Sequence, residues 1–172
     1  MPNQKELRAR RCCFTGHRPE KLHLSEKYVC NALEREIRLA VSENFQTFIT
    51  GMARGVDIWA AEIVLRLRKE GLPIHLIAAS PFKGFEKNWT RDWQDRYVSI
   101  MQNAEIALFV SQCYDRRCFQ RRNEWLVDHS ARVIAVYNGE KGGTKNTIEY
   151  AEQNGICLLY TSPSPRDRSL SR

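Results

Sequence analysis

The sequence contains no apolar run long enough to cross a membrane, and no apolar segment follows the polar, basic stretch at residues 1–11. Its six cysteines also lack the spacing of a zinc site or a disulfide framework. Cys12 and Cys13 are adjacent, and Cys113 and Cys118 are too far apart for a CxxC motif. These absences argue against a membrane protein and a disulfide-stapled secreted domain. We therefore expect a cytoplasmic protein with reduced thiols, no metal site and no membrane partner.

Two phosphate-binding signatures are absent as well: the GK[ST] end of a Walker loop and the GxGxxG of dinucleotide-binding domains. What remains is a chain of 172 residues, 42% of them hydrophobic, which is enough for one folded domain with a core. Its formal net charge of +7 favours an anionic partner, either a phosphate-bearing ligand or a nucleic acid.

Short apolar runs alternate with longer helical segments along the chain. Ser25 is a candidate N-cap, and apolar residues follow it at helical spacing up to Ala40. We expect strands at 11–15, 47–50, 74–79, 106–110 and 133–137, and further helices at 56–70, 87–103, 119–130 and 144–153. This alternation predicts a Rossmann-like, three-layer α/β/α fold with a mainly parallel sheet, forming a single domain at 11–156. A ligand is then expected beyond the carboxyl ends of the strands.

The two ends of the chain differ from this pattern. Residues 1–10 form a basic N-terminal extension, and residues 157–172 resemble a translated sequencing adapter. We expect 157–172 to be a non-native tail and the natural C-terminus to be missing, although the apolar residues 157–160 can still form a strand. The alternative is a natural tail rich in Ser, Pro and Arg that binds nucleic acid.

The first predicted strand ends in a loop that contains Thr15, Gly16, His17 and Arg18. Glycine allows a ligand to approach the backbone, while the other three side chains offer donors to phosphate or ribose. Taken alone this is a weak signal, because strand–glycine turns are common and a histidine often bonds to backbone instead.

The second predicted strand leads into a stronger signal, Gly51, Ala53, Arg54, Gly55 and Asp57, at the start of a helix. Two glycines at a strand-to-helix turn leave backbone N–H groups free at the positive end of the helix. The guanidinium of Arg54 can pair with a phosphate. The carboxylate of Asp57 can cap the helix or bind a ribose, and the sequence favours neither role.

A third loop, after the strand at 133–137, leads into the last helix through Gly142, Gly143, Thr144, Asn146 and Thr147. Its glycines, hydroxyl groups and amide form a suitable platform for phosphate or ribose.

Together these segments resemble the YpsA-type branch of the SLOG superfamily. The resemblance covers 11–156 and rests on the segments 15–19, 50–57, 81–82, 96–97, 122–130 and 142–147, together with Trp89. The segment 50–57 is also similar to the Rossmann domain of DprA (Smf), and the third loop is similar to the Lonely Guy (LOG) phosphoribohydrolases. The resemblance implies a bacterial protein with a Rossmann-like fold that binds a nucleotide or a related ligand.

The leading hypothesis is a module that binds or senses a small nucleotide-derived ligand. The resemblance points to an adenine-containing ligand related to ADP-ribose or NAD, and self-association stays open. We expect Arg54 and backbone amides to hold phosphate. Thr144, Asn146 and Asp128 are candidates for the ribose hydroxyls. Arg122 and Asn123 lie in a segment that matches the family and are expected to face the pocket.

A second hypothesis is LOG-like cleavage of an N-glycosidic bond, for which Glu149 or Asp57 would supply the carboxylate. However, Lys141 stands where the LOG motif has proline, and the sequence contains no evident nucleophile–base pair. We therefore expect binding rather than catalysis.

A third hypothesis is a DprA-like binder of single-stranded nucleic acid. Aromatic residues are interleaved with the arginines at 116–122, as in sites that stack bases, although a solvated basic face is the commoner outcome. Trp89, Trp93 and Tyr97 are expected to pack into the core through one helical face, and Trp89 is the candidate if one of these rings stacks on a base.

Overall fold

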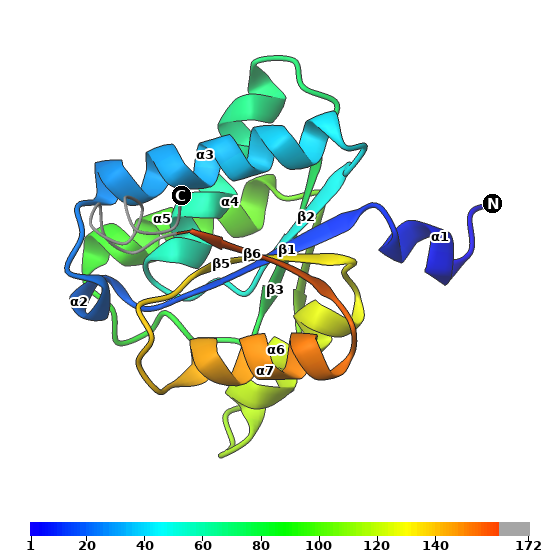
Figure 1. Ribbon diagram of the computed structural model, residues 1–172. Coiled ribbons are helices and arrows are strands. Elements are labelled where there is room, and N and C mark those ends of the chain that lie inside the picture. Colours follow the sequence, from blue (N-terminus) through cyan, green and yellow to red (C-terminus); the bar gives the residue numbers. More distant parts are fainter. Residues whose placement is uncertain (162–172) are drawn as a thin grey trace.

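The computed structural model describes residues 1–161 and has a six-stranded, all-parallel sheet at its centre (Figure 1). The strands are β1 (Arg11–Gly16), β2 (Thr47–Thr50), β3 (His75–Ser80), β4 (Ile106–Phe109), β5 (Arg132–Val136) and β6 (Cys157–Thr161). They lie in the order β4-β3-β2-β1-β5-β6. The predicted Rossmann-like α/β fold is therefore confirmed.

Helices cover both faces of the sheet. On one face lie α3 (Glu26–Ser42), α4 (Val56–Lys69) and α5 (Arg91–Asn103), and on the other lie α6 (Cys118–Asp128) and α7 (Gly143–Gln153), as Figure 1 shows. Two short helices, α1 (Gln4–Arg8) and α2 (Pro19–Leu22), flank β1 in the sequence. No helix in residues 1–161 is both long and apolar enough to span a membrane.

The strand order reverses direction at β1. From β1 the chain builds β2, β3 and β4 to one side, and then returns to add β5 and β6 on the other side. The loops that leave β1 and β5 therefore diverge and open a crevice at the carboxyl edge of the sheet, which is where open α/β sheets bind ligands.

The core explains the adjacent cysteines at the start of β1. Successive strand residues point to opposite faces, so Cys12 and Phe14 join the cluster under α3 and α4, while Cys13 joins the one under α6 and α7. Both thiols are fully buried, and burial is the main reason that the pKa of each is raised. β1 lies in the interior of a parallel sheet, so helices cover both of its faces. Its small cysteines and the ring of Phe14 pack against these helices.

The start of the helix expected at 87–103 and the predicted N-terminal extension both differ from the sequence prediction. The helix expected at 87–103 begins at Arg91, because Thr90 adopts an extended N-cap conformation and the residues before it form turns. Trp89 therefore lies just outside the helix, with its ring against Tyr97. Residues 4–8 of the predicted extension form α1, which begins with a capping box between Asn3 and Glu6.

The predicted non-native tail is described only in part. Its first five residues form β6, which pairs with β5 at the edge of the sheet, so the strand expected at 157–160 is present. The remaining residues of that tail, 162–172, lie outside the described part of the chain.

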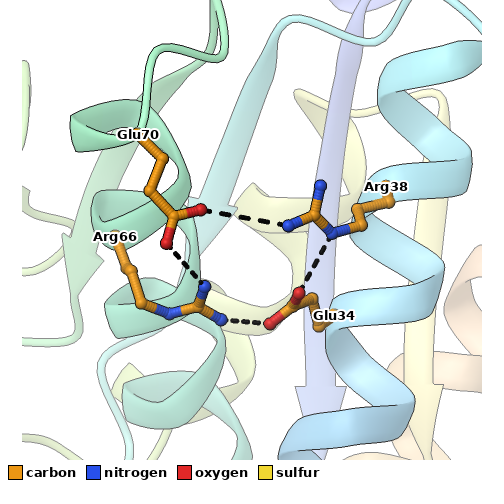
Figure 2. Close-up of polar contacts among 4 residues, drawn as sticks. All are labelled: Glu34, Arg38, Arg66 and Glu70. Atoms are coloured by element: carbon orange, nitrogen blue, oxygen red, sulfur yellow. Dashed lines mark hydrogen bonds and ion pairs between the residues drawn. The ribbon is translucent and has the colours of Figure 1, made fainter.

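Figure 2 shows a ring of four charged side chains that links α3 to α4. Arg38 pairs with Glu34 at 3.0 Å and with Glu70 at 3.9 Å, and Arg66 pairs with Glu70 at 3.2 Å and also with Glu34. These side chains are 30–49% exposed, so each pair is worth less than about 1 kcal/mol. The network links the two helices at the surface, while their buried faces supply most of the stability.

The periodicity of α3 predicts which of its residues stabilise the fold. Ile37 is fully buried in the core, whereas Leu39, two residues away on the same helix, is 44% exposed. We expect Ile37→Ala to lower the free energy of unfolding by about 2–5 kcal/mol, because it leaves a cavity. Leu39→Ala should change it by less than about 0.5 kcal/mol. Urea denaturation of both variants checks this, and equal effects would contradict the assigned face.

Candidate functional site

A cavity of about 400 Å³ lies where the carboxyl ends of β1 and β2 meet the N-termini of α4 and α7. All three loops that the sequence analysis singled out contribute to it, and α6 forms a further wall through Arg122, Asn123 and Leu126. Because these segments come from four separate parts of the chain, only folding assembles the site.

The first loop brings β1 and α4 into direct contact. A Cβ atom added at Gly16 would lie 2.4 Å from the side chain of Val56, so no larger residue fits there without a shift. His17 follows, 4% exposed, with its ring stacked on Tyr137 at a centroid distance of 5.5 Å. Burial, and then the charge of Lys21, lower the pKa of His17 and favour its neutral ring. Its Nε2 atom has no hydrogen-bond partner in residues 1–161, and His17 is one of the residues that line the cavity.

The second loop is held in shape from both ends. The hydroxyl of Thr50 donates to the carbonyl of Asp57 at 2.8 Å and accepts from the amide of Met52 at 3.3 Å. The Asp57 carboxylate in turn accepts the amide of Ala53 at 3.2 Å through Oδ2. Met52 has a φ of +67°, a conformation that few non-glycine residues adopt, and these bonds help to hold it there.

Asp57 is also a titratable group inside the cavity. It is 6% exposed, lines the cavity, and its Oδ1 has no hydrogen-bond partner in the described residues. Burial raises the pKa of Asp57 from its ordinary value of 3.8 to about 6, even though the charge of Arg122 and the Ala53 amide act in the opposite direction. The loop that precedes α4 and the cavity therefore share a carboxyl group that changes charge close to neutral pH.

Arg122 joins the two helical layers at this edge of the sheet. It belongs to α6, is 7% exposed, and donates to the carbonyl of Gly51 at 2.6 Å and to Oδ1 of Asn123 at 2.9 Å. No carboxylate in residues 1–161 lies within ion-pair distance of Arg122, and burial is the main cause of its lowered pKa. A Cβ at Gly51 would come within 2.8 Å of its side chain, so the glycine makes room for the guanidinium.

The third loop presents a helix N-terminus to the cavity. Gly142, at the N-cap of α7, has a φ of +148°, and no side chain caps this helix. Gly143 and Thr144 line the cavity, so the N-terminus of α7 lies at its wall. The first-turn N–H groups and the positive end of the helix dipole favour an anion at such a position. The side chain of Asn138 donates to the carbonyl of Lys21 at 2.9 Å and ties this loop to the first one.

Cations and aromatic rings complete the wall. Arg18 and Lys21 line the cavity, and the Lys21 ammonium lies beside the third loop, 3.6 Å from where a Cβ of Gly142 would be. Phe85 lines it from the turns after β3, and Phe119 lines it from the first turn of α6. The cavity thus combines positive charge, backbone donors and ring surfaces.

Ten of the predicted site residues line this cavity: Thr15, Gly16, His17, Arg18, Ala53, Asp57, Asn123, Gly142, Gly143 and Thr144. Three others support it from behind. Gly51 and Gly55 pack against Arg122 and Pro19, and the Thr147 hydroxyl donates to the carbonyl of Gly143 at 2.8 Å.

Four predicted residues lie elsewhere. Arg54 does not line the cavity, because it pairs with Glu20 at 2.8 Å. Asp128 is exposed and accepts the Tyr150 hydroxyl at 2.7 Å. Asn146 and Glu149 line a shallow hollow between α6 and α7. The local sequence did not indicate that Arg54 would pair with the carboxylate of Glu20.

The family match pointed to Arg122 as well as Asn123, and both line the cavity, whereas the sequence did not single out Lys21, Phe85 or Phe119 as site residues. For Lys21 a signal exists, since it falls one helical turn after Arg18 in the short segment that follows the first loop. Phe119 belongs to the run of arginines and aromatic residues at 116–122, whereas Phe85 gives no local signal, because tertiary folding alone brings it to the cavity.

A family comparison matches residues 12–156 of this chain to the model of the YspA SLOG family. The chain belongs to the YspA SLOG family. This confirms the resemblance that the three loop motifs indicated.

Relatives of this SLOG protein have similar lengths. It is 33% identical over 147 residues to YoqJ, an uncharacterised SPbeta prophage-derived protein of Bacillus subtilis, covering 78% of this chain and 84% of that protein. It is 28% identical over 157 residues to a UPF0398 protein of Bacillus cereus, covering 86% and 85%. Neither name states an activity.

Solved structures of DNA processing protein A (DprA) share the fold. The Streptococcus pneumoniae protein superposes with a TM-score of 0.68 at 19% identity, covering 94% of this chain. The Helicobacter pylori protein gives 0.64 at 17%, covering 98%. The SLOG chain spans 53% and 74% of their lengths, so it corresponds to about half of the S. pneumoniae DprA.

The raised pKa of Asp57 makes stability depend on pH. The folded state holds the carboxyl proton of Asp57 more tightly than the unfolded chain does. The stability that this protonation contributes is therefore complete below pH 4 and is lost as pH rises through 6. We expect unfolding free energy to fall by about 2 kcal/mol more across that window in the parent than in Asp57→Asn. Urea titrations at several pH values check this. Asp92→Asn removes an acid from the first turn of α5 and serves as control, because its stability should depend on pH as that of the parent does. If the stability of Asp57→Asn falls as steeply with pH as that of the parent, the assignment to Asp57 is refuted.

Proposed function

We propose that this SLOG domain binds a small nucleotide or nucleotide-derived ligand in the cavity at the carboxyl edge of its sheet. One observation carries the proposal: the N-termini of α4 and α7, neither capped by the side chain of its N-cap residue, converge on one cavity with Arg18 and Lys21 at its wall. Two helix dipoles and two cations directed at one space favour a phosphate group.

The rest of the lining suits the other parts of a nucleotide. Nε2 of His17 and Oδ1 of Asp57 are buried without partners in the described residues, and a buried polar atom without a partner costs about 1–3 kcal/mol. A ligand that carries ribose hydroxyls or a base edge would supply the missing hydrogen bonds. Phe85 and Phe119 offer ring surfaces for a base, and the volume of about 400 Å³ suits a ligand of this size.

Cleavage of an N-glycosidic bond is a second candidate function, and Asp57 is the observation that favours it. A carboxyl with a pKa of about 6 can exchange a proton near neutral pH, and it lies in the cavity, unlike Glu149. If the site turns its ligand over, free base is released from a nucleoside monophosphate. Asp57→Asn should then abolish release while the nucleotide still binds.

The binding proposal is tested by a thermal-shift panel of AMP, ADP, ATP, NAD and ADP-ribose. A ligand at one hundred times its Kd adds about 2.7 kcal/mol to the stability, which raises Tm by about 5–10 °C. We expect Lys21→Gln to weaken binding about tenfold, because it removes one charge-assisted hydrogen bond to phosphate. Lys27→Gln changes the same charge on the exposed start of α3 and should bind like the parent.

A short single strand of DNA belongs in the same panel, because the H. pylori DprA structure concerns single-stranded DNA binding. A shift with DNA and with no small nucleotide would refute the small-ligand proposal. So would equal binding by Lys21→Gln and the parent.

A further inference from the structure

A second hollow, of about 590 Å³, lies next to the cavity of about 400 Å³ in which we propose that the nucleotide binds. Phe85 and Phe119 line both spaces, so they form a ridge between them. Beyond the ridge, the wall is built from the turn after β3 and the loop before α6, with Phe82, Trp89 and Tyr114 as its further rings.

These rings form one connected cluster with an open face. Phe82 contacts Phe85 at a centroid distance of 5.6 Å, Tyr114 at 5.7 Å and Phe119 at 6.1 Å. Tyr114 nevertheless remains 63% exposed and Phe119 38% exposed. Large rings gathered at a surface with an uncovered face are characteristic of binding sites, because covering that face releases water from apolar area.

The charge around the second hollow is positive. Lys83 and Lys87 line it, and Arg116 and Arg117 are exposed in the loop that carries Tyr114. None of these four side chains takes part in an ion pair within residues 1–161, and the lining contains no carboxylate. Aromatic faces within a positive field are the combination that stacks nucleobases next to phosphates.

We propose that the second hollow is a stacking subsite for the second ring of a dinucleotide whose first nucleotide occupies the cavity. This inference rests on the proposed function and narrows its ligand to two ring systems joined through phosphate. The bridge would cross the ridge of Phe85 and Phe119, between the cations of the cavity and those of the second hollow.

The surroundings favour a dinucleotide over a longer strand. Each hollow has the volume of a small-ligand pocket, and the two share a wall. The hollow between α6 and α7 is lined by Glu124 and Glu149, which repel phosphate and do not continue a positive track in that direction.

Titration calorimetry with matched probes tests this proposal. In the first pair, NAD carries a nicotinamide ring that ADP-ribose lacks. In the second pair, the phosphorylated dinucleotide pApA carries a second adenosine, with its phosphate, that AMP lacks. We expect the two-ring member of at least one pair to bind about tenfold more tightly, the usual gain from stacking one base. Tyr114→Ala should remove most of that gain and leave the affinity for AMP and ADP-ribose unchanged.

Phe109→Ala provides the matched control. Phe109 is an aromatic residue on β4 that is 44% exposed and lines neither hollow, so this variant should keep the whole gain. Equal loss in both variants would point to general destabilisation and overturn the assignment of Tyr114.

The remaining outcomes separate this inference from the proposal on which it rests. If AMP or ADP-ribose binds and neither two-ring probe gains affinity, the subsite is refuted and the proposed function stands. If hexadeoxyadenylate binds more than tenfold tighter than both two-ring probes, the occupant is a nucleic acid strand and the dinucleotide is refuted. If no probe binds, both proposals fail.

Discussion

The buried guanidinium of Arg122 is the interaction on which the site depends. It reaches from α6, on one face of the sheet, to the carbonyl of Gly51 in the loop that leads into α4 on the other face. A buried cation is costly unless its hydrogen bonds are made, and here a carbonyl, the Asn123 amide oxygen and the nearby charge of Asp57 partly compensate it. The loop at 51–55 is therefore fixed from both helical layers.

Fixing the loop in this way leaves other groups short of partners. Asp57 accepts the Ala53 amide of this loop with one oxygen, and its other oxygen has no hydrogen-bond partner within residues 1–161. Nε2 of His17, another residue that lines the cavity, also has none there. Residues that destabilise a fold locally concentrate at functional sites, where a ligand supplies what the protein lacks. In the proposed complex, ribose hydroxyls or a base edge would supply the missing hydrogen bonds, while a phosphate near the two helix N-termini would balance the buried charge of Arg122.

The fold and the three loops could be predicted because their signals are local. Strands and helices alternate in the sequence with distinct periods, and glycine between a strand and a helix indicates a close backbone approach. Helix starts were predicted less well, as at Arg91, because an N-cap depends on backbone conformation that several nearby residues could adopt. Arg54 was assigned to phosphate from its motif alone, and the structure places it on Glu20 of α2 instead.

By itself, the sequence determined the parallel α/β architecture, the family and the segments that reach the carboxyl edge of the sheet, since each follows from patterns within short stretches. Only the tertiary structure decided which side chains meet there. Lys21, Phe85 and Phe119 join the cavity, and Arg54, Asp128, Asn146 and Glu149 do not. The physical reason is that a side chain's environment depends on neighbours distant in the chain, and on which of them offers the nearer opposite charge or open space.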